Sequence, residues 1–192
     1  MKTVLLILFI ITLRQFVFAK GDTCIAGVYV SRDDLVNNNL SHKINTGDAG
    51  YKLTFPPIAD WKLEIKIVTP DNIYKFPAGS VYGYYECGKA YRYSPGGRLY
   101  AIEDFYRIEE KGHLIIYTAA FNGGSEHYYS LNFDAPVKRL NIQNLKQDFH
   151  GQARFIYKAK KLKRKGVRGG LAMQDDKGNY IINEIYDKTI KE

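Results

Sequence analysis

Apolar and polar residues alternate most clearly between positions 80 and 133, where tyrosine-rich runs are separated by glycine-bearing turns. Alternation of this kind puts successive side chains on opposite faces of an extended strand. The turn residues divide the segment into strands that follow one another along the chain. The pattern therefore predicts an antiparallel β meander, around which the rest of the chain is arranged.

The two turns in the middle of this segment determine which residues of neighbouring strands face each other. In the first hairpin Tyr106 is predicted to lie opposite Ile115, and in the second Tyr128 is predicted opposite Ala119. The assignment of faces depends on this register, because a slip of one residue exchanges the two faces of a strand.

Each face of the predicted meander has its own character. One face is aliphatic and aromatic and is the expected core: Phe105, Leu114, Ile116, Leu131 and Phe133. The other, the tyrosine face, mixes rings with polar groups: Tyr100, Asp104, Tyr106, Tyr117, Tyr128 and Ser130. Since tyrosine rings stack on sugars while polar groups bond hydroxyls, we expect the tyrosine face to bind a glycan or another ring-bearing ligand. The alternative is that the tyrosines simply fill the sheet, because tyrosine is a favoured strand residue.

The remaining segments predict further strands and a few helices. Trp61–Thr69 alternates strictly and predicts a half-buried strand, and Tyr180–Tyr186 predicts an edge strand. Capping residues and helical spacing predict helices within Ser31–Leu40, Asn141–Phe149 and Gln152–Lys165. The fold is thus predicted to be mainly β, an antiparallel meander forming a sandwich or a partly closed barrel. Two or three short helices accompany it, with an α+β tendency at the C-terminus.

Residues 1–19 have the pattern of a secretory signal peptide: an early lysine, an apolar run and Ala19 at a small-residue cleavage site. A membrane anchor is the rival interpretation, but Arg14 interrupts the run where a charge costs roughly 2.5–3.5 kcal/mol. Cleavage would leave an antiparallel β domain at 20–150 and a basic extension at 151–192, with a helix and a strand packed on the same domain. We expect a periplasmic or secreted protein associated with the cell envelope.

Cys24 and Cys87 are the two cysteines of the chain. An exported protein meets an oxidising compartment, where a pair of thiols can close. A disulfide between them is therefore predicted, with two buried thiols that never meet as the alternative.

The formal charge of +8 is concentrated in one short segment. The segment holds seven basic residues, the basic patch: Lys158, Lys160, Lys161, Lys163, Arg164, Lys165 and Arg168. Because the rest of the predicted mature chain is nearly balanced in charge, a general nucleic-acid-binding surface is not indicated. The patch is expected to adsorb to anionic lipid, lipopolysaccharide or acidic glycan, and the alternative is a solvated helix end.

The sequence contains no strong catalytic or cofactor motif. Its four histidines are scattered, so neither a metal site nor a cofactor is predicted. Ser125 follows two glycines but lacks the Gly-x-Ser-x-Gly pattern, and Glu103 and Asp104 are adjacent and would point to opposite faces of a strand. A non-enzymatic binding protein is favoured. An enzyme acting on carbohydrate or cell-wall material, or a structural subunit, is the alternative.

Several short motifs carry a resemblance: Gly27-Val-Tyr29, Tyr82-Gly-Tyr84, Tyr91-Arg92, Ile116-Tyr117, Tyr129-Ser130 and Asn144-Leu145. With these the chain resembles a loose group of exported proteins of the Bacteroidota, over most of its predicted mature length. The resemblance implies a periplasmic or secreted location, and it implies no activity.

Overall fold

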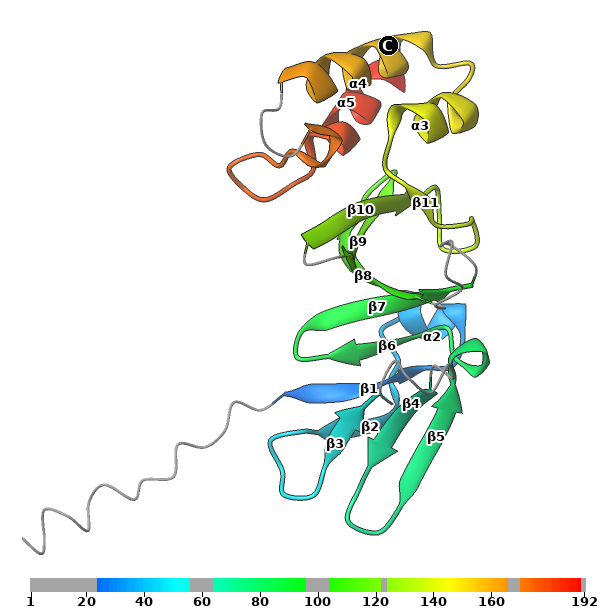
Figure 1. Cartoon of the computed structure of the whole chain (residues 1–192), viewed down its shortest axis with the longest axis vertical. Helices are drawn as coiled ribbons and strands as arrows, with labels where there is room; N and C mark the ends of the chain where they lie inside the picture. Colours follow the sequence, from blue (N-terminus) through cyan, green and yellow to red (C-terminus); the bar gives the residue numbers. More distant parts are fainter. Residues whose placement is uncertain (1–23, 56–63, 96–103, 122–123, 166–169, 191–192) are drawn as a thin grey trace, which may run out of the picture.

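Strand pairing organises the chain into two antiparallel sheets, with helices gathered at the C-terminal end (Figure 1). The computed structural model describes residues 24–55, 64–95, 104–121, 124–165 and 170–190. The predicted signal peptide and Tyr100 lie outside these ranges. Within them, the prediction of a mainly antiparallel β fold with a few helices is confirmed.

The larger sheet has eight strands in the order β11-β10-β9-β8-β7-β6-β1-β2. The strands are β1 (Ile25–Tyr29), β2 (Ser41–Asn45), β6 (Gly83–Glu86), β7 (Lys89–Ser94), β8 (Asp104–Lys111), β9 (Ile115–Phe121), β10 (Gly124–Ser130) and β11 (Lys138–Arg139). From β6 to β11 each strand pairs with the next along the chain, which confirms the meander. The β1–β2 hairpin extends the sheet by pairing β1 with β6.

The smaller sheet contains β3 (Lys52–Thr54), β4 (Glu64–Val68) and β5 (Ile73–Pro77). The alternation predicted for Trp61–Thr69 is confirmed over β4, where Ile65 and Ile67 are fully buried. Their partners in this first core cluster include Val28 and Tyr84 of the larger sheet. The two sheets therefore pack as layers around a shared apolar core.

The helices are α2 (Arg32–Val36), α3 (Ile142–Asp148), α4 (Ala153–Lys165) and α5 (Ile181–Ile190), with 3-10 turns η2 (Ala78–Ser80) and η3 (Gly170–Ala172). The predicted capping is confirmed at two of them. Ser31 accepts from the backbone N–H of Asp34 while Asp34 accepts from Ser31 N–H at 2.9 Å, which completes a capping box. Among the helices of the described ranges, none has the length and apolar character needed to cross a membrane.

The edge strand predicted at Tyr180–Tyr186 is wrong, because this segment enters α5. Only Tyr180 makes a strand-like contact, an isolated bridge to Gln174. A short apolar run does not distinguish a strand from a buried helix, and here the apolar residues suit a helix packed on α4. The carboxylate of Glu110 also accepts from Tyr180 N–H at 2.6 Å and so satisfies a backbone donor at the start of the helix.

The predicted strand register is also wrong, although the faces survive. In the first hairpin Tyr117 pairs with Ile108 and not with Asp104, the partner that the predicted register gives it. The difference arises because β8 continues to Lys111 through an irregularity between Ile108 and Glu110. In the second hairpin Tyr128 pairs with Tyr117 and not with Ala119, because β10 begins directly at Gly124. Up to Ile108 in the first hairpin, and throughout the second, the slip is of an even number of residues, so Tyr117 and Tyr128 keep their predicted face. Beyond the irregularity in β8 the slip is odd.

The face predicted as core is only partly the core that forms. Leu114 and Ile116 are fully buried against the C-terminal helices, as expected. Phe105 instead packs with the cluster between the two sheets, Phe133 packs on the tyrosine face, and Leu131 is 41% exposed. Phe105 and Phe133 depart from the prediction because the sheet is buried on both faces around β8–β10, by different parts of the chain.

Candidate functional site

Four residues of the tyrosine face come together on one face of the sheet, but they are buried. Tyr106, Tyr117, Tyr128 and Ser130 are at most 5% exposed, and the Tyr106 ring lies edge-on to Tyr128 with centroids 4.8 Å apart. Tyr100 lies outside the described residues, and Asp104 is the first residue of β8. The interpretation of these rings as an open stacking surface is therefore corrected. They form a core cluster that a ligand cannot reach without opening the fold.

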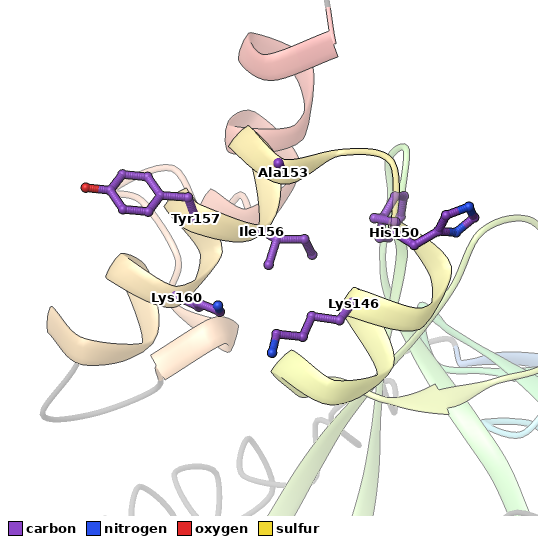
Figure 2. A pocket seen from close by; sticks show the side chains of 7 residues that line it. Lys146, His150, Ala153, Ile156, Tyr157 and Lys160 are labelled. Carbon is purple, nitrogen blue, oxygen red and sulfur yellow. The ribbon is translucent and has the colours of Figure 1, made fainter.

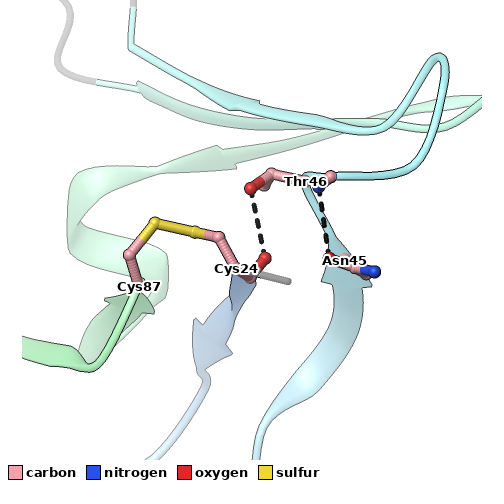
Figure 3. Close-up of a disulfide and its surroundings, with 5 residues drawn as sticks. Cys24, Asn45, Thr46 and Cys87 are labelled. Atoms are coloured by element: carbon pink, nitrogen blue, oxygen red, sulfur yellow. Dashed lines mark hydrogen bonds between the residues drawn. A yellow bond between two sulfur atoms is a disulfide. The ribbon is translucent and has the colours of Figure 1, made fainter. Parts of the chain in front are cut away.

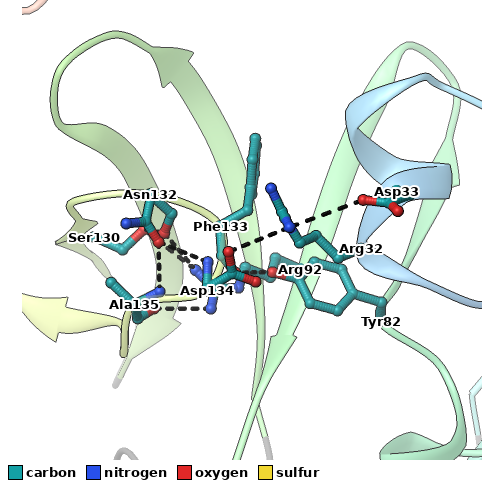
Figure 4. Close-up of polar contacts among 9 residues, drawn as sticks. All are labelled: Arg32, Asp33, Tyr82, Arg92, Ser130, Asn132, Phe133, Asp134 and Ala135. Carbon is teal, nitrogen blue, oxygen red and sulfur yellow. Dashed lines mark hydrogen bonds and ion pairs between the residues drawn. The ribbon is translucent and has the colours of Figure 1, made fainter.

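The tyrosine face is buried because residues 131–137, the covering segment, fold across it (Figure 4). Phe133 and Val137 of this segment pack against the ring cluster. The hydroxyl of Tyr82 donates to the backbone carbonyl of Phe133, and Arg32 of α2 forms an ion pair with Asp134 at 3.3 Å. Burial raises the pKa of Tyr82 to about 12, so its hydroxyl remains a donor at neutral pH.

The guanidinium of Arg92 in β7 holds the covering segment in place through hydrogen bonds. Its Nη1 donates to the hydroxyls of Tyr117 at 3.0 Å and Ser130 at 3.2 Å, and its Nη2 donates to the carbonyl of Ala135 at 2.9 Å. These partners are all neutral, and the side chain is almost fully buried. Sequence reasoning missed this role, although an arginine at an inward-facing strand position was the available signal. The arrangement is a structural clamp in which both terminal nitrogens of the guanidinium bond within the chain, while the buried Nε has no partner among the described residues.

The disulfide between Cys24 and Cys87 is formed, as predicted, with Cα atoms 4.6 Å apart (Figure 3). Cys87 is exposed in the β6–β7 turn with φ of 47°, and Cys24 directly precedes β1. Next to the bridge, the carbonyl of Cys24 accepts from the hydroxyl of Thr46 at 3.1 Å (Figure 3). It also accepts from Thr46 N–H at 2.8 Å. The bond therefore ties the first described strand to the meander, as is typical of proteins that fold in an oxidising compartment.

The basic patch lies mainly on α4, whose two faces differ sharply. The inner face, with Phe155, Ala159 and Leu162, is buried in the core cluster that the helices form with Leu114 and Ile116. The outer face carries the four exposed cations of the basic patch: Lys160, Lys161, Lys163 and Arg164. Lys158 is half-buried, Lys165 is the last residue of the helix, and Arg168 lies outside the described residues.

None of the four exposed cations forms an ion pair with a carboxylate in the described parts of the chain. Lys161 instead lies over the ring of Tyr157, with its Nζ 4.7 Å from the ring centroid. The hydrogen bond from Lys161 also lowers the pKa of the Tyr157 hydroxyl. The outer face of α4, which we call the cationic face, is thus positively charged and open to solvent.

Beside the cationic face, a hollow of about 370 Å³ lies between α3 and α4 (Figure 2). It is lined by Lys146, Phe149, His150, Ala153, Ile156, Tyr157 and Lys160. Phe149 and Ile156 are buried, and the remaining lining side chains are exposed. Sequence reasoning missed this α3–α4 pocket, because it depends on how two separate helices pack.

Three of the four histidines in the described residues contact particular side chains, and the ring of His42 lies 4.5 Å from that of Tyr74. His113 Nε2 lies 2.7 Å from Asp187 Oδ1, and the His127 ring meets Tyr180 edge-on at 5.9 Å. In the described ranges, no three His, Cys, Asp or Glu side chains converge closely enough to hold a metal ion.

Comparison with known proteins identifies no relative: no protein-family model, curated protein or solved structure matches the chain. Charge and geometry must therefore support any functional conclusion. Of the features described, the cationic face and the α3–α4 pocket are exposed and leave polar groups available, whereas the tyrosine face and the Arg92 clamp are internal.

Proposed function

We propose that the protein is an exported, non-enzymatic binding protein of the cell envelope that docks on anionic membrane lipid through the cationic face. The observation that carries this proposal is the composition of α4, which has seven basic residues and no acidic residue among its thirteen. Four of those cations are exposed together without carboxylate partners in the described chain. An unpaired cluster of this kind attracts an anionic surface.

The proposed location is supported by two features. The Cys24–Cys87 bond is exposed on the Cys87 side and would be open to reduction in a cytosol rich in thiols. The pattern of residues 1–19 adds a signal for export. Mass spectrometry of the protein taken from the envelope tests this location, and the expected first residue is Lys20.

The strength of docking can be estimated from the charges. A lysine or arginine close to an anionic membrane contributes about 1 kcal/mol, so four exposed cations contribute about 4 kcal/mol. This corresponds to a dissociation constant on the order of 1 mM, which is weak and reversible. Screening over about 8 Å at physiological ionic strength makes such binding sensitive to salt.

The helix is expected to lie on the lipid surface and not to insert into it. An inserting amphipathic helix buries its apolar face among the acyl chains. Here Phe155, Ala159 and Leu162 of that face are already packed in the protein core. Tyr157 is the large side chain left outside, at 58% exposed, and an aromatic ring in that position suits the headgroup layer.

Sedimentation with lipid vesicles tests the proposed function. The protein should pellet at low salt with vesicles containing phosphatidylglycerol and remain in solution with vesicles of phosphatidylcholine alone. Retention should fall steeply when salt is raised from about 0.01 M to 0.15 M, because the Debye length shortens from about 30 Å to about 8 Å. Equal retention on both kinds of vesicle would contradict the proposal.

A further inference from the structure

We infer that the α3–α4 pocket is a separate binding site for a small amphiphile that carries a phosphate group on a single apolar chain. This inference goes beyond the proposed docking on lipid surfaces and does not depend on it. It concerns a soluble ligand held between two helices, whereas docking concerns the outer face of one helix; Lys160 belongs to both.

The pocket combines an apolar floor with two converging cations. Phe149 of the α3 end and Ile156 of α4 supply the floor, and both are buried. Lys146 reaches the opening from α3 and Lys160 reaches it from α4, so the two ammonium groups approach the same space from opposite walls (Figure 2). His150 and Tyr157 point away from this space in the same view. The packing of α3 against α4 thus brings the ammonium groups of Lys146 and Lys160 to the same pocket.

Neither lysine is neutralised within the described chain. Lys146 and Lys160 form no ion pair there, and the nearby acid of α3, Asp148, is engaged by the Tyr129 hydroxyl at 2.7 Å and by Lys138. Two like charges facing one opening repel each other, and an anion between them relieves that repulsion. The charge of the pocket therefore favours an anionic ligand.

Size and shape narrow the class of ligand further. A volume of about 370 Å³ falls at the lower end of small-molecule sites, which occupy about 300–1,000 Å³. Lysine binds phosphate as a compact point charge and has three rotatable donors, which suits two lysines sharing one phosphate. The buried ring of Phe149 and the methyl groups of Ile156 suit the start of an alkyl chain. A free, single-chain alkyl phosphate satisfies both requirements.

Decyl phosphate, used below its micelle-forming concentration, is the probe for the experiment. Backbone amide shifts from nitrogen-15 NMR should change saturably and should cluster around Lys146, Phe149 and Ile156. Decanol should bind at least about tenfold more weakly, because a hydrogen bond to a charged group corresponds to about that factor. Inorganic phosphate should also bind at least about tenfold more weakly, because burial of about two methylene groups corresponds to a similar factor.

Three variants locate the site. Ala153→Phe fills the opening from an exposed position and should abolish binding, and Lys146→Gln should weaken binding about tenfold. Lys163→Gln, on the same helix but outside the lining, is the matched control and should bind as wild type does. Unchanged affinity in Ala153→Phe, or equal affinity for decanol and decyl phosphate, would overturn the inference. Vesicle docking tests the proposed function, whereas binding of decyl phosphate tests the pocket. Either proposal can therefore be contradicted without the other.

Discussion

The side-chain amide of Asn183 replaces a strand partner for the backbone of Leu114. Asn183 Oδ1 accepts from Leu114 N–H at 2.9 Å, and Asn183 Nδ2 donates to the carbonyl of Leu114 at 3.0 Å. The same Nδ2 also donates to Glu110 of β8. Through this one residue α5 is fastened to the turn between β8 and β9, and with it the helical layer that presents α4.

Asn183→Ala should lower the free energy of unfolding by about 3 kcal/mol. The substitution leaves the buried N–H and C=O of Leu114 without partners, and each such group costs about 1–3 kcal/mol. Urea denaturation measures the change. Gln147→Ala, at an exposed position of α3, is the control and should stay within about 0.5 kcal/mol of wild type. If Asn183→Ala is as stable as this control, the Asn183 amide does not hold α5 on the turn between β8 and β9.

Arg92→Lys should destabilise the protein by about 2–3 kcal/mol and should loosen the covering segment. Only the planar guanidinium reaches the hydroxyls of Tyr117 and Ser130 with one nitrogen and the carbonyl of Ala135 with the other. Hydrogen exchange of the amides in residues 131–137 provides the local measurement. An exchange pattern identical to that of wild type would show that positive charge alone, without the fork geometry, holds the segment.

Reduction of the disulfide should cost about 4 kcal/mol of stability. The bond joins residues separated by 63 positions, and the chain-entropy relation gives about 4 kcal/mol for a loop of that length. The thermal midpoint should therefore fall clearly in the presence of a reductant, and a Cys24→Ala, Cys87→Ala protein should show the same fall without one. A double variant that melts with the oxidised wild type would contradict this role.

Stability should decrease as the pH falls below about 7, in part through His127. Burial lowers the pKa of this histidine, and of the nearby charged groups Glu109 raises it and Arg107 lowers it. Below the unfolded value of about 6.5 the unfolded chain binds a proton that the folded chain does not, so the free energy of unfolding drops until the folded-state pKa is reached. Urea denaturation at a series of pH values checks this, with His127→Gln as the variant. The variant should lose part of the slope between about pH 7 and pH 5.5, and an unchanged slope would exclude His127 as its source.

The features that depend on neighbouring residues could be predicted from the sequence. Ser31 and Asn141 cap helices through hydrogen bonds that span three residues, and strict alternation located β4. The Cys24–Cys87 bond followed from the presence of just two cysteines in a chain whose first residues predict export. Each of these inferences needs only local geometry or composition.

The features that depend on distant segments could not be predicted in the same way. The irregularity between Ile108 and Glu110 shifts the register, yet no turn residue marks it. The tyrosine face is closed by a segment that Arg92 holds from β7, 43 positions away from Ala135. The α3–α4 pocket likewise arises from helix packing, so alternation and spacing along one strand or helix carry no signal for it.

Retention on anionic vesicles by variants of equal net charge tests the proposed function most directly. One variant neutralises the cationic face with Lys160→Gln, Lys161→Gln, Lys163→Gln and Arg164→Gln. The matched control neutralises four exposed lysines on the sheets, Lys43, Lys52, Lys75 and Lys89. At low salt the proposal predicts that the first variant loses most of its retention on phosphatidylglycerol vesicles, while the control keeps that of wild type within about twofold. Equal losses in the two variants would show that net charge, and not the cationic face of α4, drives adsorption, and would contradict the proposed function.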